Sequence, residues 1–142
     1  MIIYELTHLF YQHAGEFVNS PKNLGLYYSY ENIRHAIHYY TTLPGFCDCP
    51  EAFSIRERIV HGDVVDGIVF EAIVYLHSED YEFENSIELG LYGDERIAQN
   101  KVIRFCEENR SLTSIPKLII EKIVNKCFVE KREWSEGFSI CE

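Results

Sequence analysis

The feature that most constrains the fold of this chain is a repeated tetrapeptide. Leu24-Gly25-Leu26-Tyr27 recurs as Leu89-Gly90-Leu91-Tyr92, 65 residues further along a chain of 142 residues. Each copy follows a long strand-like pattern and a loop, and each precedes a helical pattern. Self-similarity of this kind indicates a repeated structural unit. The sequence therefore predicts a single domain made of two pseudo-repeats, residues 1–66 and 67–142.

Turn residues and apolar periodicity place the elements of the first repeat. Ser29 is a typical N-cap residue, and Pro44 and Gly45 end the helical pattern that follows it. Tyr40 falls on the apolar stripe of that helix, so we expect it to be buried. The predicted elements are a strand at residues 2–11, a loop at 13–23, a strand at 24–28, a helix ending at about 42 and a strand at 52–60.

The second repeat shows the same order of elements. Asp94 is placed to cap a helix, and Pro116 stands before the last strand as Pro50 does in the first repeat. The predicted elements are a strand at residues 68–77, an acidic loop at 78–85, a strand at 86–92, a helix ending at about 108, a short helix at 115–120 and a strand at 121–129.

These elements predict an α+β fold with two ββαβ units. We expect antiparallel sheets with one main helix in each unit. A three-stranded sheet with one helix buries little surface by itself, so the two units are expected to share one core. Gly25 and Gly90 stand inside strands, where glycine is typical of a bulge or of a close backbone approach.

The net charge limits the partners of the chain. Acidic residues outnumber basic ones by 23 to 13, which gives a formal net charge of −10. Binding to nucleic acid or to an anionic membrane requires clustered Lys and Arg, so neither partner is predicted. A basic protein is favoured instead, because opposite fields accelerate encounter. The alternative is that the acidic excess only keeps the chain soluble.

Several features indicate a cytoplasmic protein. No apolar run approaches the roughly 18–20 residues needed to span a bilayer. The first residues, from Met1 to Glu5, lack the basic start of a signal peptide. The cysteine count is five, an odd number that favours free thiols in a reducing compartment.

Two stretches carry a resemblance to a known family. The matching residues are Leu24, Gly25, Leu26, Tyr27, Tyr28, Ser29, Glu31, Ala36, Ile37, Leu43, Pro44, Gly45, Phe46, Pro50, Phe53 and Ile55, and then Trp134, Ser135, Glu136, Gly137 and Phe138. They resemble small bacterial proteins that are similar to immunity proteins encoded beside polymorphic or contact-dependent toxins. In that family the closing tryptophan segment follows the first unit, whereas here the second repeat intervenes. The resemblance implies a fold and a toxin–immunity context, and it supplies no catalytic residue.

The strongest candidate for a binding site is an acidic segment with interleaved aromatic residues. Acidic residues are dense between residues 79 and 95, and no Lys or Arg interrupts them. Aromatic anchors ringed by carboxylates are typical of contacts with a basic partner. The candidate residues are Glu79, Asp80, Tyr81, Glu82, Phe83, Glu84 and Glu88. The alternatives are a solvated hairpin whose aromatic rings point inward, and a calcium loop, although the spacing lacks the regular EF-hand order.

Aromatic residues near the first helix are the second candidate for partner contact. Tyr28 and Tyr30 are expected to be exposed and to join the binding surface, because tyrosine is enriched at interfaces. Trp134 and Phe138 are expected to plug the core and to hold the C-terminal segment in place.

A metal- or small-ligand site is the alternative function. His35 and His38 lie three residues apart on the exposed face of the first helix, and Cys47 and Cys49 follow shortly afterwards. Histidine and cysteine are the usual zinc ligands, but the Cys-x-Cys spacing is unusual for zinc. No motif of a nucleotide-binding loop, a serine hydrolase or a zinc protease is present, so neither an enzyme nor a cofactor is predicted.

The sequence therefore predicts an immunity protein that binds a cognate toxin domain. The toxin is expected to be a basic nuclease, because a nuclease cleft must be basic to hold phosphate. The acidic and aromatic residues would occlude or flank that cleft.

Overall fold

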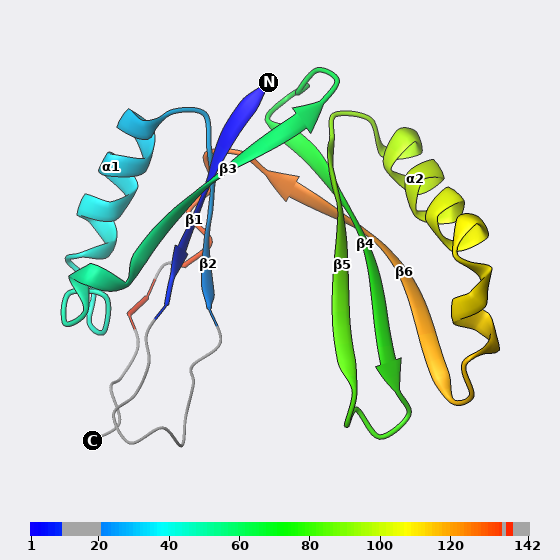
Figure 1. Ribbon diagram of the computed structural model, residues 1–142. Coiled ribbons are helices and arrows are strands. Elements are labelled where there is room, and N and C mark those ends of the chain that lie inside the picture. Colours follow the sequence, from blue (N-terminus) through cyan, green and yellow to red (C-terminus); the bar gives the residue numbers. More distant parts are fainter. Residues whose placement is uncertain (10–20, 135, 138–142) are drawn as a thin grey trace. The chain divides into compact units, whose positions relative to one another are not determined.

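The computed structural model describes residues 1–9, 21–134 and 136–137 (Figure 1). Over these residues the protein is α+β, and it forms six strands and two α-helices. The elements are β1 (Ile2–His8), β2 (Lys22–Tyr27), α1 (Tyr30–Tyr40), β3 (Phe53–His61), β4 (Ile68–Ser78), β5 (Glu84–Tyr92), α2 (Glu95–Glu108) and β6 (Leu118–Phe128), with short 3₁₀ helices at Pro50–Ala52 and Arg110–Ser114.

The chain divides into two compact units. The unit that we call terminal comprises Ile2–Arg58 and Phe128–Glu142, and the unit that we call central comprises Met1 and Ile59–Cys127. Hydrogen bonding places the strands in the order β2-β1-β3 in the terminal unit and β3-β5-β4-β6 in the central unit. Strand β3 contributes its first part to one unit and its end to the other.

In the terminal unit, α1 buries one face against β1 and β2. Ser29 is the N-cap, as predicted, and its side chain accepts a hydrogen bond from the backbone N–H of Asn32. Tyr40 is fully buried, which confirms its predicted place in the core. The core consists of Leu6, Leu24, Tyr27, Ile33, Ala36, Tyr40 and Phe46.

In the central unit, α2 lies along one face of β4 and β5 (Figure 1). Asp94 is the N-cap, as predicted, and its side chain accepts from the backbone N–H groups of Arg96 and Ile97. The core consists of Ala72, Val74, Leu76, Tyr92, Ala98 and Val102. The predicted end of α2 at residue 108 is confirmed.

The two Leu-Gly-Leu-Tyr segments lie at matching irregularities. In the antiparallel pair β1–β2, the register shifts between Leu6 and Thr7, beside Gly25. In the antiparallel pair β4–β5, it shifts between Ala72 and Ile73, beside Gly90. Both glycines have a positive φ, +114° and +136° respectively, which side chains rarely allow. The predicted bulges are therefore confirmed.

Two expectations from the sequence are wrong. The strand pairing is mixed and not purely antiparallel, because β3 and β5 pair in parallel at Val60 and His61. Apolar alternation shows which face of a strand is buried, but not the direction of a distant partner. The short helix predicted at 115–120 is absent, because Lys117 takes a positive φ of 61° and β6 already begins at Leu118. Alternating exposure along this stretch fits a strand.

Some predictions lie outside the described residues. The predicted continuation of the first strand to Tyr11, most of the loop at 13–23, Cys141 and Phe138 fall there. Within the described ranges, no helix is both long enough and apolar enough to cross a membrane.

Candidate functional site

The acidic segment forms the turn that joins β4 to β5, and we call residues 79–84 the acidic turn. Its base is closed by the pair His77 and Glu84, which lie opposite each other in the antiparallel register. The backbone N–H of Ser78 donates to the carbonyl of Phe83 at 3.0 Å, and that of Tyr81 donates to the carbonyl of Ser78 at 3.1 Å. The turn therefore has a defined backbone path, in which Tyr81 takes a positive φ of 59°.

Asp80 holds the turn together from inside. Its carboxylate accepts from the Ser78 hydroxyl at 2.7 Å and from the backbone N–H of Glu82 at 3.2 Å. The Ser78 hydroxyl oxygen in turn accepts from the N–H of Phe83 at 3.0 Å. The hydrogen bond from Ser78 lowers the pKa of Asp80 below its usual value. Asp80 is therefore a structural residue of the turn as well as one of its charges.

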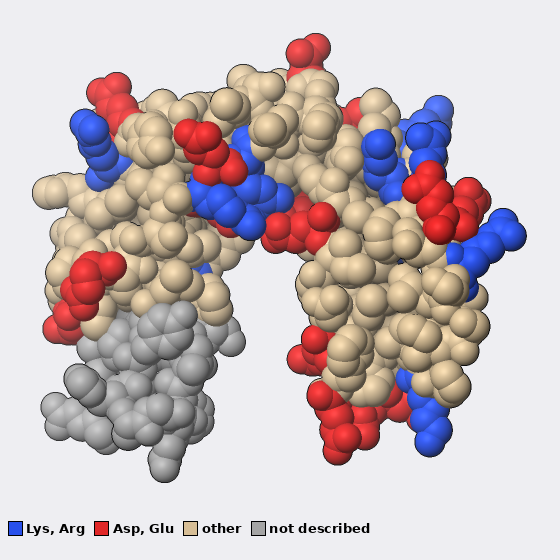
Figure 2. All heavy atoms as spheres, viewed as in Figure 1, with Lys and Arg blue, Asp and Glu red and all other residues tan. Residues whose placement is uncertain are grey.

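The other carboxylates of the turn are presented to solvent. Glu79, Glu82 and Glu84 are exposed, and among the described residues none of them forms an ion pair with a Lys or Arg. Figure 2 shows acidic side chains gathered at this end of the β4–β5 hairpin. Glu84 accepts a hydrogen bond from the Tyr75 hydroxyl at 2.5 Å, and this bond raises the pKa of Tyr75 to about 12.

The two aromatic residues of the turn are also exposed. Tyr81 keeps 58% of its accessible surface and Phe83 keeps 51%. One face of the Tyr81 ring stacks on the ring of His77, with centroids 4.6 Å apart and planes 2° apart. Charge and apolar surface therefore lie together on a turn whose conformation is fixed.

The remaining predicted contact residues do not all join this turn. Glu88 is exposed on β5, further along the same hairpin. Tyr28 and Tyr30 are exposed, as predicted, at 38% and 48%. Both belong to the terminal unit, where the Tyr30 ring packs on Tyr4 at 4.4 Å. The candidate site is therefore the acidic turn alone.

The sequence reasoning missed three residues beside the turn, namely Tyr75, His77 and Glu121. His77 is buried, with 3% exposure, although it is polar and close to a loop. Alternation along β4 places Tyr75 and His77 on the same face, and this signal was available in the sequence. The approach of Glu121 from β6 depends on distant strand pairing, which the sequence does not reveal.

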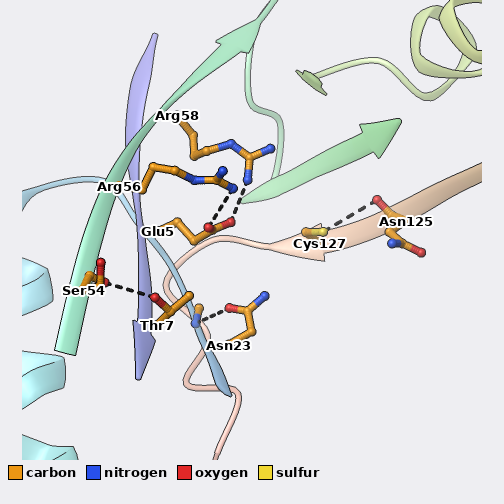
Figure 3. A network of polar contacts seen from close by, with 9 residues as sticks. Glu5, Thr7, Asn23, Ser54, Arg56, Arg58, Asn125 and Cys127 are labelled. Carbon is orange, nitrogen blue, oxygen red and sulfur yellow. Dashed lines mark hydrogen bonds and ion pairs between the residues drawn. The ribbon is translucent and has the colours of Figure 1, made fainter. Parts of the chain in front are cut away.

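One acidic residue outside the acidic turn, Glu5, is neutralised within its own unit. In the terminal unit, Glu5 forms ion pairs with both Arg56 and Arg58, with oxygen–nitrogen distances of 2.9 and 2.6 Å (Figure 3). The side chains of Glu5 and Arg58 are largely buried, at 14% and 9% exposure. This group ties β1 to β3, whereas the carboxylates of the acidic turn face solvent.

The residues of the alternative metal site do not form a cluster. His35, His38 and Cys47 are exposed, whereas Cys49 is buried. Burial raises the pKa of the Cys49 thiol, which makes the thiolate that binds metal less available. Over residues 1–9, 21–134 and 136–137, no three His, Cys, Asp or Glu side chains are grouped closely enough to hold a metal ion.

The closing tryptophan segment packs on the terminal unit. The Trp134 ring meets Phe46 edge to face at 6.1 Å, and its backbone N–H donates to the Tyr40 hydroxyl at 3.3 Å. Gly137 lies so close to Pro44 that a β-carbon would overlap the proline backbone. The predicted role of Trp134 in the core is therefore confirmed.

Comparison with known proteins leaves the family open. No model of a protein family, no curated protein and no solved structure matches this chain. The resemblance to immunity proteins is therefore a prediction from the sequence motifs.

Proposed function

We propose that this protein is a cytoplasmic immunity protein that binds and neutralises a cognate toxin domain, a basic nuclease. The observation that carries the proposal is the acidic turn. It combines exposed carboxylates with two exposed aromatic rings on a backbone held by its own hydrogen bonds. A nuclease cleft is lined with basic residues because it must hold phosphate, and this turn has the complementary charge.

The physical argument concerns both the rate and the affinity of binding. A net charge of −10 attracts a basic partner over a long range, which raises the association rate. Tyr81 and Phe83 supply apolar contact area at a low entropic cost because the turn is already ordered. Aromatic residues at the centre of an interface commonly carry most of its binding energy.

We also infer that the two ββαβ halves are pseudo-repeats. The helices begin at Tyr30 and Glu95, which are 65 residues apart, as the tetrapeptides are. In each half a tyrosine hydroxyl donates to the carbonyl three residues earlier, from Tyr27 to Leu24 and from Tyr92 to Leu89. A matching bulge and a matching cap accompany each tetrapeptide. The acidic turn belongs to the second half, so duplication would have left one copy free to acquire it.

The decisive experiment uses the product of the neighbouring gene. We expect that gene to encode a large exoprotein that ends in a small basic domain, and we expect the isolated domain to bind this protein. Its nuclease activity should fall when the two are mixed at equal concentration. The association rate should drop steeply as salt rises, because screening shortens the range of charge attraction.

Matched variants separate the turn from the general acidity of the chain. Glu79→Gln combined with Glu82→Gln removes two charges from the turn without touching the hydrogen bonds made by Asp80. Glu107→Gln combined with Glu108→Gln removes the same charge from the end of α2. We expect the first pair to slow association by about tenfold and the second pair to have little effect. Equal effects would refute the proposed site.

A further inference from the structure

Within the central unit, the sheet formed by β5, β4 and β6 has helices on only one face. The side chains that pack beneath α2 include Ala72, Val74 and Leu76 of β4 and Leu118, Ile120 and Val124 of β6. The stretch Ile59–Cys127 is described throughout, and its only other helix, the 3₁₀ helix Arg110–Ser114, contributes Leu112 to the same core. Because successive residues of a strand point to opposite faces, the residues between these core positions lie on the other face, which we call the open face. They include Ile73, Tyr75 and His77 of β4 and Ile119, Glu121 and Ile123 of β6.

The middle of the open face is apolar. Strand β4 lies between β5 and β6, and its residues Ile73 and Tyr75 are only half-buried. On β6, Ile123 is half-buried as well, and Ile119 keeps 36% of its accessible surface. The Tyr75 hydroxyl donates to Glu84, which holds the ring in place. Contiguous apolar surface of this kind is typical of an interaction site.

Carboxylates lie on both sides of this apolar strip. On β5, Glu88 stands opposite Ile73 and Glu84 stands opposite His77 in the antiparallel register. On β6, the carboxylate oxygen Oε2 of Glu121 lies 3.5 Å from Nε2 of His77. Strands β4 and β5 contain no Lys or Arg. The two lysines of β6 share the alternate positions of its core residues, which places them on the α2 face. The open face therefore has an apolar middle strand, carboxylates on both neighbouring strands and no basic side chain from these three strands.

The size of the open face suits a single α-helix. Neighbouring strands lie about 4.8 Å apart, so three strands span about 10 Å, and an α-helix with its side chains is about 10–12 Å wide. α2 already lies along the opposite face of β4 and β5. From Glu84 to Glu88 a strand advances about 13 Å, which corresponds to about nine residues of helix. A helix of about three turns along β4 therefore covers the apolar strip and reaches the carboxylates on both sides.

We propose that the open face binds an amphipathic α-helix of the toxin domain, whose apolar stripe is bordered on both sides by Lys or Arg. The stripe packs on Ile73, Tyr75 and Ile123. Its basic borders pair with Glu88 on one side and with Glu121 on the other. This inference rests on the proposed function, and it extends the contact from the acidic turn to the neighbouring sheet. A helix fits better than another sheet, because carboxylates on both sides of one apolar strand match the two borders of one helical stripe.

The first experiment titrates the protein with designed peptides of about 18 residues, long enough to form a helix. A basic peptide has a leucine stripe with Lys and Arg on both borders. An acidic peptide has the same stripe with Glu on the borders, and a scrambled peptide has the composition of the basic one without a stripe. Nuclear magnetic resonance follows the backbone amides of the protein.

We expect the basic peptide to shift the amide signals of Ile73, Tyr75, Ile119 and Ile123. It should bind at least about tenfold more tightly than either control peptide, because only it combines the stripe with complementary charge. Equal binding of the three peptides, no binding, or shifts confined to other residues would each overturn the proposal.

A matched pair of variants tests the apolar part of the contact. Ile119→Thr removes apolar surface from the open face and keeps a β-branched residue in the strand. Ile103→Thr makes the same change on the exposed side of α2, where Ile103 keeps 46% of its accessible surface. We expect Ile119→Thr to weaken binding of the basic peptide by about threefold and Ile103→Thr to leave it unchanged. Equal effects would show that the peptide does not use the open face.

A second matched pair tests the charges. Glu88→Gln combined with Glu121→Gln removes one carboxylate from each side of the apolar strip, and we expect it to weaken binding by about tenfold. Glu107→Gln combined with Glu108→Gln removes the same charge from the end of α2 and should have little effect. If the two double variants weaken binding equally, the carboxylates of the open face are not the partners of the basic residues.

Two other occupants of the open face would overturn the proposal. A second copy of the chain would give a dimer in sedimentation, and dilution would then shift the signals of β4 and β6. A segment of the same chain would give nuclear Overhauser contacts in the free protein between Tyr75 or Ile123 and residues outside Ile59–Cys127. Either result would show that the face is already covered.

The outcomes separate this inference from the proposed function. The peptide experiment needs no toxin, so it tests the helix site even if the chain protects against nothing. If Glu79→Gln with Glu82→Gln slows association with the toxin domain while Ile119→Thr does not weaken the complex, only the helix site fails.

Discussion

The two Leu-Gly-Leu-Tyr segments have the same local structure but different surroundings. In both, the glycine takes a positive φ and the ring of the following tyrosine lies over it, so that a β-carbon would meet that ring at 3.1–3.5 Å. In the terminal unit, the carbonyl of Lys131, which follows β6, also lies close to Gly25, so that a β-carbon would come within 2.4 Å of its oxygen. In the central unit, the three atoms nearest to a β-carbon at Gly90 all belong to Tyr92, and the closest is 3.3 Å away. The tetrapeptide therefore specifies a backbone shape, and the segment packed against it differs from one copy to the other.

In the central unit, a different glycine is approached closely by the backbone of another segment. There, the chain that follows β3 lies against Gly93, where a β-carbon would overlap the carbonyl of Asp63. The corresponding residue in the terminal unit is Tyr28, which keeps a side chain, and its N–H donates to the Glu130 carboxylate at 2.8 Å. The comparison teaches that a repeated sequence can keep its turn chemistry while its long-range contacts diverge.

The largest expected effect comes from substituting the first glycine. Gly25→Ala combines a strained φ with overlap between the new methyl group and the backbone of Lys131. We expect a loss of about 3 kcal/mol or more in the free energy of unfolding. Gly90→Ala is the matched control: it carries the strain without the overlap, and we expect a loss of about 1–2 kcal/mol.

Chemical denaturation followed by tryptophan fluorescence and circular dichroism measures both glycine variants. Trp134 is the only tryptophan in the chain and packs on the terminal unit, so its fluorescence reports on the unit that holds Gly25. Equal losses for the two variants would show that the contact with Lys131 does not distinguish the copies.

The second effect concerns the tryptophan segment itself. Trp134→Ala removes the half-buried indole ring that packs on Phe46. We expect it to lower the free energy of unfolding by about 2 kcal/mol. Amide hydrogen exchange should show the loss of protection in α1 and β2 and unchanged protection in α2 and β5. A uniform loss over both units would mean that they unfold together.

These comparisons show why part of the fold could be predicted from the sequence. The caps at Ser29 and Asp94, the bulges at Gly25 and Gly90, and the acidic turn are local, so nearby residues determine them. The parallel pairing of β3 with β5 is not local, because alternation carries no information about a distant partner. The placement of Glu121 beside the turn was missed for the same reason.

The third effect compares the two helix caps. Asp94→Ala removes an acceptor that serves two backbone N–H groups, and we expect a loss of about 1 kcal/mol. Ser29→Ala should cost less, about 0.5 kcal/mol. The start of α1 is also held by the Glu130 carboxylate, which accepts from the side-chain amide of Asn32 at 2.8 Å.

Thermal or chemical unfolding of the two cap variants checks this order. The double variant Ser29→Ala with Glu130→Gln is the control, since it weakens the second acceptor too and should bring the loss in the terminal unit close to that of Asp94→Ala. A larger loss for Ser29→Ala alone would contradict the backup role of Glu130.

The smallest effect concerns a residue without a counterpart in the other copy. Counting from the residue opposite each glycine, the position of Tyr75 corresponds to Leu9 in the terminal unit. The hydrogen bond to Glu84 raises the pKa of Tyr75 to about 12 from 10.0. Because folding raises the pKa of Tyr75, its hydrogen bond to Glu84 stabilises the folded state fully below pH 10. This stabilisation is lost as the pH rises through the pKa of Tyr75 in the folded protein, about 12. Burial also raises the pKa of Tyr27, Tyr40 and Tyr92, so ultraviolet titration should show several tyrosines that ionise late. Tyr75→Phe should reduce the late absorbance change by one tyrosine, and Glu84→Gln should move the ionisation of Tyr75 to lower pH. If the late absorbance change is as large in Tyr75→Phe as in the unaltered protein, Tyr75 does not ionise late, and the two copies differ less at this edge than their contacts indicate.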